Sequence, residues 1–214
     1  MATVIDDFSS TGPGWPLTTT TIGVLHNEES ALSGVIGRVR DTRIDVTGVH
    51  GQISEDFVVA NGVYAHTLTT TGRASAEFSY GCYRNGLSAP WSVFIDSSRD
   101  LNADLTGDLG VMLRFDTIDQ PGDVAITIFS DGVEYSAPSF RVTAPGSLEI
   151  PFSSFASLTD RGSIDGFHVK LIGPRAWDLS LDSIGTYVPE PTTMAILALG
   201  GLGLISRRRK ARPV

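Results

Sequence analysis

The sequence predicts an all-β protein, an antiparallel β-sandwich of the jelly-roll kind. Several short segments alternate apolar and polar side chains, a pattern that places one face of each strand on a core. Asn-Gly and Asp-Gly pairs, which supply the positive φ angles of tight hairpins, separate these segments. Gly is also abundant, with 23 residues in 214. Because long helical patterns are scarce, we expect strands joined by turns rather than a mixed fold.

The clearest strands lie in the second half of the chain, at residues 110–117, 123–130 and 166–173. Their alternating apolar side chains are expected in the core: Val111, Leu113, Phe115, Val124, Ile126, Ile128, Phe167, Val169 and Leu171. Weaker alternation predicts further strands over residues 18–25, 43–48, 63–70, 74–80, 91–96, 139–144, 147–152 and 178–187. About ten short strands at this spacing are typical of a sandwich or jelly roll.

The connections are expected to be tight turns. Hairpins are predicted at Asn61-Gly62, Asn85-Gly86 and Asp131-Gly132, and the best short helix is Pro151–Leu158. The single cysteine, Cys82, rules out an intrachain disulfide and a cysteine-based zinc cluster. We expect Cys82 to be a small, partly buried residue beside a turn.

The charge is divided unevenly along the chain. Of the 16 basic and 24 acidic residues, five basic and one acidic lie beyond residue 187. The body therefore holds 11 basic and 23 acidic residues, a net charge of −12. Such a body repels phosphate backbones, so we expect no nucleic-acid partner.

The segment that opens with VIDDFSS at residue 4 and closes with WDLSLDSIGTY at residue 187 resembles the galactose-binding-like jelly rolls of many carbohydrate-binding modules. The resemblance implies one β-sandwich domain over residues 1–187 and suggests polysaccharide binding. Such modules hold sugars on exposed aromatic side chains with polar groups around them. Candidate carbohydrate contacts are Trp15, Tyr80 and Tyr83.

A structural calcium ion is a further possibility, and no other cofactor is expected. Asp6 and Asp7 begin the first strand, whereas Asp178 and Asp182 flank the last one. The first and last strands of a jelly roll commonly lie close, so hard oxygen ligands could converge there. The related modules often carry a structural calcium in this kind of region.

Motifs of common enzymes are missing from the sequence. The four histidines form no known metal or catalytic pattern, and there is no Gly-x-Ser-x-Gly elbow, His-Glu-x-x-His or P-loop. We therefore expect a non-enzymatic protein. Two alternatives stay open: a secreted polysaccharide hydrolase, which needs only two carboxylates, and a structural matrix protein without a ligand.

The C-terminal residues 188–214 carry three features in order. Pro189-Glu190-Pro191 comes first, then the apolar run Met194–Ile205, and then a basic cluster of Arg207, Arg208, Arg209 and Lys210. As a helix the run would span roughly 18 Å, less than the ~30 Å hydrocarbon core of a bilayer. This layout resembles the PEP-CTERM sorting domain of exopolysaccharide-producing Gram-negative bacteria.

The PEP-CTERM resemblance implies a route through the cell. A membrane-embedded exosortase would recognise Pro189-Glu190-Pro191 and cleave near it, after a short hydrophobic helix had held the precursor transiently in the inner membrane. The basic cluster stays cytoplasmic by the positive-inside rule, so the body is exported to the cell surface or extracellular matrix. The chain opens with MATVIDDFSS, without a basic and apolar signal peptide. We therefore expect the exported precursor to begin upstream of Met1.

Overall fold

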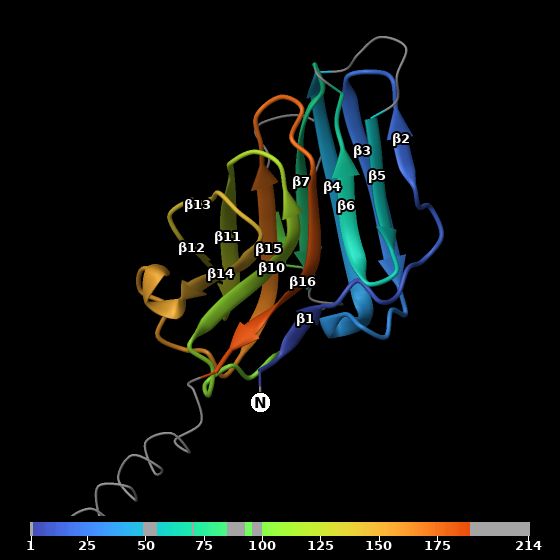
Figure 1. Cartoon of the computed structure of the whole chain (residues 1–214). Coiled ribbons are helices and arrows are strands. Elements are labelled where there is room, and N and C mark those ends of the chain that lie inside the picture. Colours follow the sequence, from blue (N-terminus) through green and yellow to red (C-terminus); the bar gives the residue numbers. More distant parts are fainter. Residues whose placement is uncertain (1, 49–54, 70, 85–92, 96–99, 189–214) are drawn as a thin grey trace, which may run out of the picture.

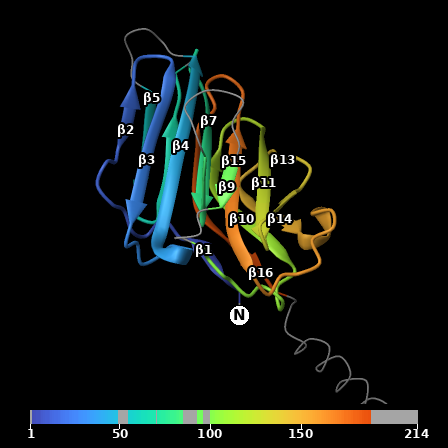
Figure 2. The ribbon, with the colours of Figure 1, turned by 180° about the vertical axis from the view of Figure 1, so that it is seen from behind.

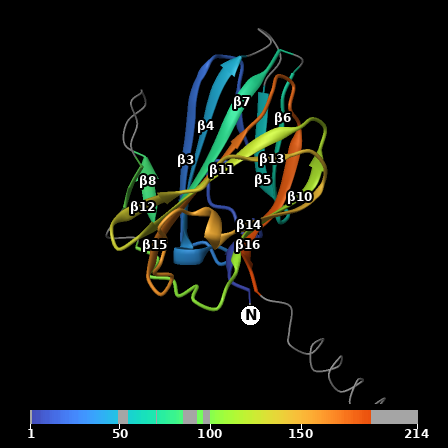
Figure 3. The same cartoon turned by 90° about the vertical axis from the view of Figure 1, so that its left-hand side faces the viewer.

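Two seven-stranded antiparallel sheets pack face to face, which confirms the predicted sandwich. The computed structural model describes residues 2–48, 55–69, 71–84, 93–95 and 100–188 (Figure 1). Seen from the side, the sheets form two layers (Figure 3). The chain crosses between them repeatedly, as in a jelly roll. The predicted C-terminal helix lies outside the described residues.

The first sheet contains the last strand of the sandwich near its centre. Its strands follow the order β14 (Gly146–Pro151), β10 (Gly110–Ile118), β16 (Leu179–Tyr187), β6 (Val63–Thr67), β5 (Glu55–Ala60) and β2 (Leu17–Thr19). The seventh strand, β1 (Val4–Asp6), also pairs with β16. The chain's first and last strands are therefore neighbours, as the sequence predicted.

The second sheet carries the longest continuous ladder. Its order is β12 (Val133–Ser136), β11 (Gly122–Ser130), β15 (Ile164–Ile172), β7 (Arg73–Tyr80), β4 (Val39–Gly48) and β3 (Gly23–Ser30), and β13 (Phe140–Val142) also pairs with β11. A separate ribbon pairs β8 (Cys82–Arg84) with β9 (Val93–Ile95). Short 3₁₀ turns are η1 (Ile36–Arg38) and η2 (Phe152–Ser154).

Several boundaries differ from those predicted. The segment 18–25 divides into β2 and β3, and the helix expected over Pro151–Leu158 is only the three-residue η2, because Pro151 and Phe155 both have extended backbone angles. The strand β5 was not predicted: it buries Glu55 beside Phe57 and Val59, so its inward face does not look apolar. β12 was missed as well.

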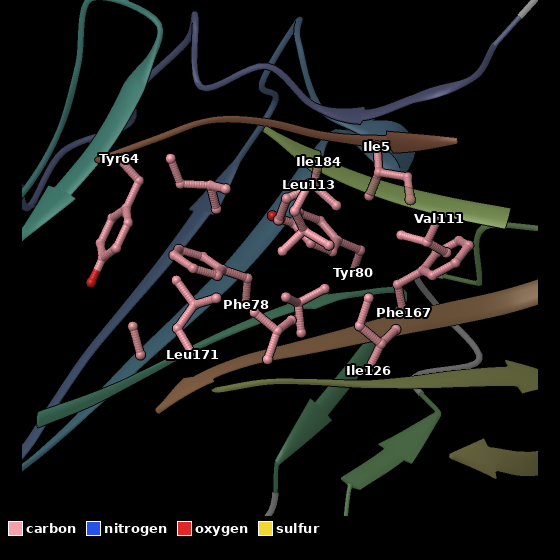
Figure 4. Packing of buried hydrophobic residues seen from close by; sticks show 14 of the residues in the cluster. Ile5, Tyr64, Phe78, Tyr80, Val111, Leu113, Ile126, Phe167, Leu171 and Ile184 are labelled. Atoms are coloured by element: carbon pink, nitrogen blue, oxygen red, sulfur yellow. The ribbon is translucent and has the colours of Figure 1, made fainter. Parts of the chain in front are cut away.

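The predicted turns and core are confirmed. Asn61-Gly62 and Asp131-Gly132 have positive φ angles and connect β5 to β6 and β11 to β12; Asn85-Gly86 lies outside the described residues. The nine apolar side chains expected in the core are each at most 2% exposed, and side chains from both sheets meet between the layers (Figure 4). Each stabilises the fold by about 1.5–3 kcal/mol through burial.

A buried ion cluster joins the two sheets. Arg40 of β4 is fully buried and donates charge-assisted hydrogen bonds to two carboxylates. Its Nη1 donates to both oxygens of Asp6 of β1 (3.1 Å to Oδ1 and 2.9 Å to Oδ2), and its Nε donates to Oε2 of Glu29 of β3 (2.9 Å). Tyr80 of β7 donates its hydroxyl hydrogen to Asp6 Oδ2 at 2.8 Å. Since β1 belongs to the first sheet and the other three strands to the second, the cluster ties the layers together.

The same cluster orders the chain that follows β1. Arg40 Nη2 donates to the carbonyl of Ser10 at 3.2 Å, and its guanidinium lies 5.3 Å from the ring centroid of Phe8. The backbone N–H of Phe8 donates to Asp6 Oδ1 at 2.8 Å. Burial raises the pKa of Asp6, although Arg40 acts in the opposite direction. The chain after β1 is therefore held by the same two side chains, Arg40 and Asp6, that connect the sheets.

A second polar group, His66, lies inside the core. Its Nδ1 is 3.2 Å from the Tyr64 hydroxyl, and its ring centroid is 5.3 Å from that of Trp177. Complete burial lowers its pKa to about 4, so the imidazole is neutral at physiological pH. Trp177 is itself fully buried and donates its Nε1–H to the carbonyl of Gln120 at 2.7 Å. A side chain at Gly173 would clash with this indole, its Cβ only 1.9 Å from Trp177 Cε3.

We predict that Arg40→Met lowers the free energy of unfolding by about 3–5 kcal/mol, because it leaves two carboxylates buried without a cation. Combining it with Asp6→Asn and Glu29→Gln should recover part of that loss. Urea unfolding at pH 7 measures both differences. A loss below about 1 kcal/mol for Arg40→Met would show that the cluster contributes little.

We predict that the stability falls by about 3 kcal/mol between pH 6.5 and pH 4 through His66 alone. In that range the unfolded chain binds a proton at His66, whereas the folded chain with its lowered pKa does not. His66→Leu should remove this part of the pH dependence, measured as the difference between the two urea-unfolding profiles. Identical slopes in both proteins would contradict the burial of a neutral imidazole.

Candidate functional site

The outer face of the second sheet carries two adjacent rows of polar side chains, which we call the polar rows. Paired positions give a first row of His26, Arg43, Glu77 and Lys170. The second row runs through Glu28, Asp41, Ser79, His168, Thr127 and Ser136. The neighbours of these residues along each strand, such as Ile44, Phe78 and Val169, fill the core, so the polar side chains project to the opposite face. Figure 2 views this sheet with β3, β4, β7, β15 and β11 side by side.

Glu77 is the centre of the polar rows. Its carboxylate lies 2.8 Å from Lys170 Nζ and 3.4 Å from His168 Nε2. Burial alone would raise the pKa of Glu77, but the hydrogen bonds and charges of His168 and Lys170 outweigh it and hold the pKa well below the ordinary 4.5. Glu77 is therefore a buried anion that orients the side chains of Lys170 and His168.

A second ion pair stands at the β3 end of the rows. His26 Nε2 lies 2.7 Å from Asp41 Oδ1, and half of the His26 side chain is exposed. The hydrogen bond to Asp41 raises the pKa of His26, against the smaller effect of partial burial. The raised pKa keeps a larger fraction of His26 protonated near neutral pH, so this end of the rows presents a donor to solvent.

Hydroxyl groups stand at the other end. Thr127 Oγ1 and Ser136 Oγ are 2.9 Å apart, and this pair is exposed. The first sheet carries a similar exposed pair, in which Thr117 Oγ1 and Ser180 Oγ are 2.7 Å apart. The middle of the rows is buried, and the groups that reach solvent are His26 and Glu28 at the β3 end, Lys170, and the hydroxyl pair at the β12 end. These exposed groups suit a ligand rich in hydrogen-bonding groups.

The β8–β9 ribbon lies on this same side of the second sheet, away from the core (Figure 4), and contacts β7 and β15. Cys82 of β8 is buried and donates its S–H to the carbonyl of Phe167 at 3.1 Å. Burial raises the pKa of the Cys82 thiol to about 12. The cysteine is therefore a packing residue beside a turn, as predicted, and not a nucleophile.

The aromatic side chains proposed as sugar contacts occupy different environments. Tyr80 is fully buried and bonded to Asp6, so its ring belongs to the core and offers no surface to a sugar. Trp15 is half-buried and packs edge-on against Tyr64, with ring centroids 6.5 Å apart. Tyr83 pairs with Phe94 in the β8–β9 ribbon, but its side chain lies outside the described residues.

The four aspartates considered for calcium, Asp6, Asp7, Asp178 and Asp182, have other partners. The carboxylate of Asp6 is bound to Arg40 instead of being open to a cation. Asp7 Oδ1 accepts the backbone N–H of Ser9 at 2.9 Å. Across the parts of the chain that the structure describes, no three His, Cys, Asp or Glu side chains are grouped to hold a metal ion.

The two aspartates of the last strand region are also engaged. Asp178 Oδ1 accepts the backbone N–H of Leu68 at 2.7 Å, and partial burial raises the pKa of Asp178, assisted by the nearby charges of Asp119 and Glu55. Asp182 faces Arg114 at 3.6 Å. These carboxylates stabilise the loops and surface of the first sheet.

The polar rows themselves were not identified from the sequence. The outward positions of segments 74–80 and 166–173 do carry Glu77, Ser79, His168 and Lys170, and their alternation was visible. The order of strands in the sheet was not, because β15 lies between β7 and β11 although it follows β14 in the chain. Only the pairing brings these side chains together.

Residues 188–210 match the PEP-CTERM protein-sorting motif. This confirms that a PEP-CTERM sorting motif follows the sandwich, and the matched range includes Pro189-Glu190-Pro191 and the basic cluster. The match begins directly after Tyr187, the last residue of β16. Among the residues that the structure describes, no helix is long and apolar enough to cross a membrane; the run Met194–Ile205 is not among them.

Solved structures similar to this chain include the family 11 carbohydrate-binding module of the cellulosomal cellulase Lic26A-Cel5E of Clostridium thermocellum. It is 15% identical, and the alignment covers 88% of this chain and 95% of that one with a TM-score of 0.40. The agarase AgWH50C is 13% identical over 88% of this chain and 25% of its own, with a TM-score of 0.37. No curated protein matches the chain.

Proposed function

We propose that the chain is an exported, non-enzymatic protein of the cell surface or extracellular matrix, sorted through residues 188–214. The observation that supports this is the match of residues 188–210 to a protein-sorting motif, placed where the last strand ends. The β-sandwich of residues 1–187 is the cargo. The tail is held transiently in the inner membrane, recognised at Pro189-Glu190-Pro191 by an exosortase, and cleaved.

The cargo binds polysaccharide at the polar rows. A polysaccharide offers closely spaced hydroxyls that both donate and accept hydrogen bonds. His26 and Lys170, whose side chains are partly exposed, supply donors, and the exposed Thr127–Ser136 hydroxyl pair supplies donors and acceptors. Asp41 and Glu77 are buried and hold the side chains of His26 and Lys170 in place. Strands hold these groups in fixed positions, which lowers the entropy lost on binding. Tyr83, in the ribbon on this face, remains a candidate stacking residue.

The hydrolase alternative is disfavoured at this face. A glycosidase needs a carboxylic acid that stays protonated at working pH to donate to the leaving group. Glu77 does not meet this requirement, because the hydrogen bonds of His168 and Lys170 outweigh the effect of burial and hold its pKa well below the ordinary 4.5. Glu77, which is buried, can therefore orient Lys170 toward a glycan but cannot act as a general acid.

We predict that the double variant Thr127→Val with Ser136→Ala binds the host's exopolysaccharide about tenfold more weakly. Each of the two substitutions removes a hydroxyl whose hydrogen bonds are worth roughly 1 kcal/mol. The matched control is Thr117→Val with Ser180→Ala, the similar hydroxyl pair of the other sheet. Affinity electrophoresis measures both. Equal effects of the two double variants would contradict binding at the polar rows, and no binding by the unaltered protein would favour a purely structural matrix component.

We predict that replacing Pro189, Glu190 and Pro191 together by alanine makes the chain accumulate unprocessed in the membrane fraction. The prolines keep the peptide extended for an enzyme, and alanines would let the following helix extend upstream. Cell fractionation and immunoblotting of the native host measure the shift. Normal release of the triple variant would contradict the sorting role.

A further inference from the structure

An apolar groove lies at the end of the sandwich where the last strand finishes. It has a volume of about 670 Å³. Phe152 and Phe155 are buried beneath it, and Leu109, Leu158 and Tyr187 stand along it. Leu109 is 46% exposed, one of only four large hydrophobic side chains that are well exposed in the part of the chain that the structure describes.

The walls of the groove are held firmly in place. The backbone N–H of Leu109 donates to the carbonyl of Tyr187 at 2.8 Å, and that of Phe152 donates to the carbonyl of Leu109 at 2.9 Å. Arg161 donates Nη1–H to the carbonyl of Asp108 at 2.6 Å, and its guanidinium lies 5.4 Å from the Phe152 ring centroid. The groove therefore combines an apolar surface with one fixed cation.

The groove is next to the sorting motif in the chain itself. Tyr187 lines the groove, and the match to the motif begins at the next residue. At about 3.5 Å per residue, Pro189 and Pro191 lie at most ~7 Å and ~14 Å along the chain from Tyr187. An enzyme that closes around Pro189-Glu190-Pro191 must therefore come against this end of the sandwich, where β16 and η2 lie (Figure 1).

We propose that this groove is a docking surface for the membrane enzyme that cleaves the sorting motif. The enzyme would insert an apolar segment along Leu109 and Leu158 and offer an acceptor to Arg161. The inference rests on the proposed sorting function and adds to it a contact outside the motif. The lipid surface is a weaker alternative, because a body with a net charge of −12 is repelled by anionic headgroups.

The test compares Leu109→Asp with Ile22→Asp in the full-length precursor, produced in the native host. Ile22, which is 66% exposed between β2 and β3, is the matched control because it is an exposed aliphatic residue away from the groove. We expect Leu109→Asp to slow conversion of precursor to processed chain by about tenfold in a pulse-chase experiment, and Ile22→Asp to leave it unchanged. Ala156→Glu, at an exposed position of the groove, should act like Leu109→Asp without disturbing the core.

Two further variants distinguish a failure of the docking proposal from a failure of the proposed sorting function. If the triple alanine variant of Pro189-Glu190-Pro191 is not processed while both groove variants are processed normally, the docking surface is refuted and the sorting function stands. If the triple variant is processed normally, the sorting function itself fails. A photo-crosslinking amino acid at position 109 should form an adduct with an epitope-tagged exosortase, and an adduct with lipid alone would overturn the proposal in favour of membrane contact.

Discussion

The buried guanidinium of Arg40 is the constraint on which most of this structure depends. It holds the carboxylates of Asp6 and Glu29, and so connects β1 of one sheet to β3 and β4 of the other. Because neighbours along a strand face opposite ways, the positions of Asp41 and Ser79 on the outer face follow from those of Arg40 and Tyr80 inside. β1 also pairs with β16, the strand that leads to the sorting motif. One interior ion cluster thus lies beside both the polar rows and the strand pair β1–β16.

The sequence predicted the strands that bury apolar side chains in strict alternation, such as Val111–Phe115 and Phe167–Leu171, because their periodicity reports burial directly. The prediction from sequence was wrong where charged side chains are buried in the core. Asp6 was predicted to be a calcium ligand, and β5 was not predicted because the inward Glu55 interrupts its apolar alternation. The sequence alone does not show which cation or backbone N–H will bind a buried carboxylate. Tyr80 was predicted to lie at the surface, because the sequence does not show that a buried carboxylate accepts its hydroxyl hydrogen. Its hydroxyl is buried because Asp6 accepts its hydrogen bond.

The sorting motif and the proposed binding face differ in how much of each can be predicted from the sequence alone. The sorting signal is a linear motif, and Pro189-Glu190-Pro191 with the following apolar and basic segments is recognisable without any fold. The polar rows depend on strand order, so Glu77 and His168 become partners only when β7 and β15 are placed side by side. A sorting motif is read as a peptide, whereas the proposed binding face exists only after folding.

We propose that the tail is a sorting signal that is removed on export, while the sandwich remains. Intact-mass analysis of the protein recovered from the cell surface or medium of its native host tests this most directly. We predict a mature chain that ends near Glu190 and retains the complete sandwich. A chain that still ends at Val214 and stays in the cytoplasm would contradict the account.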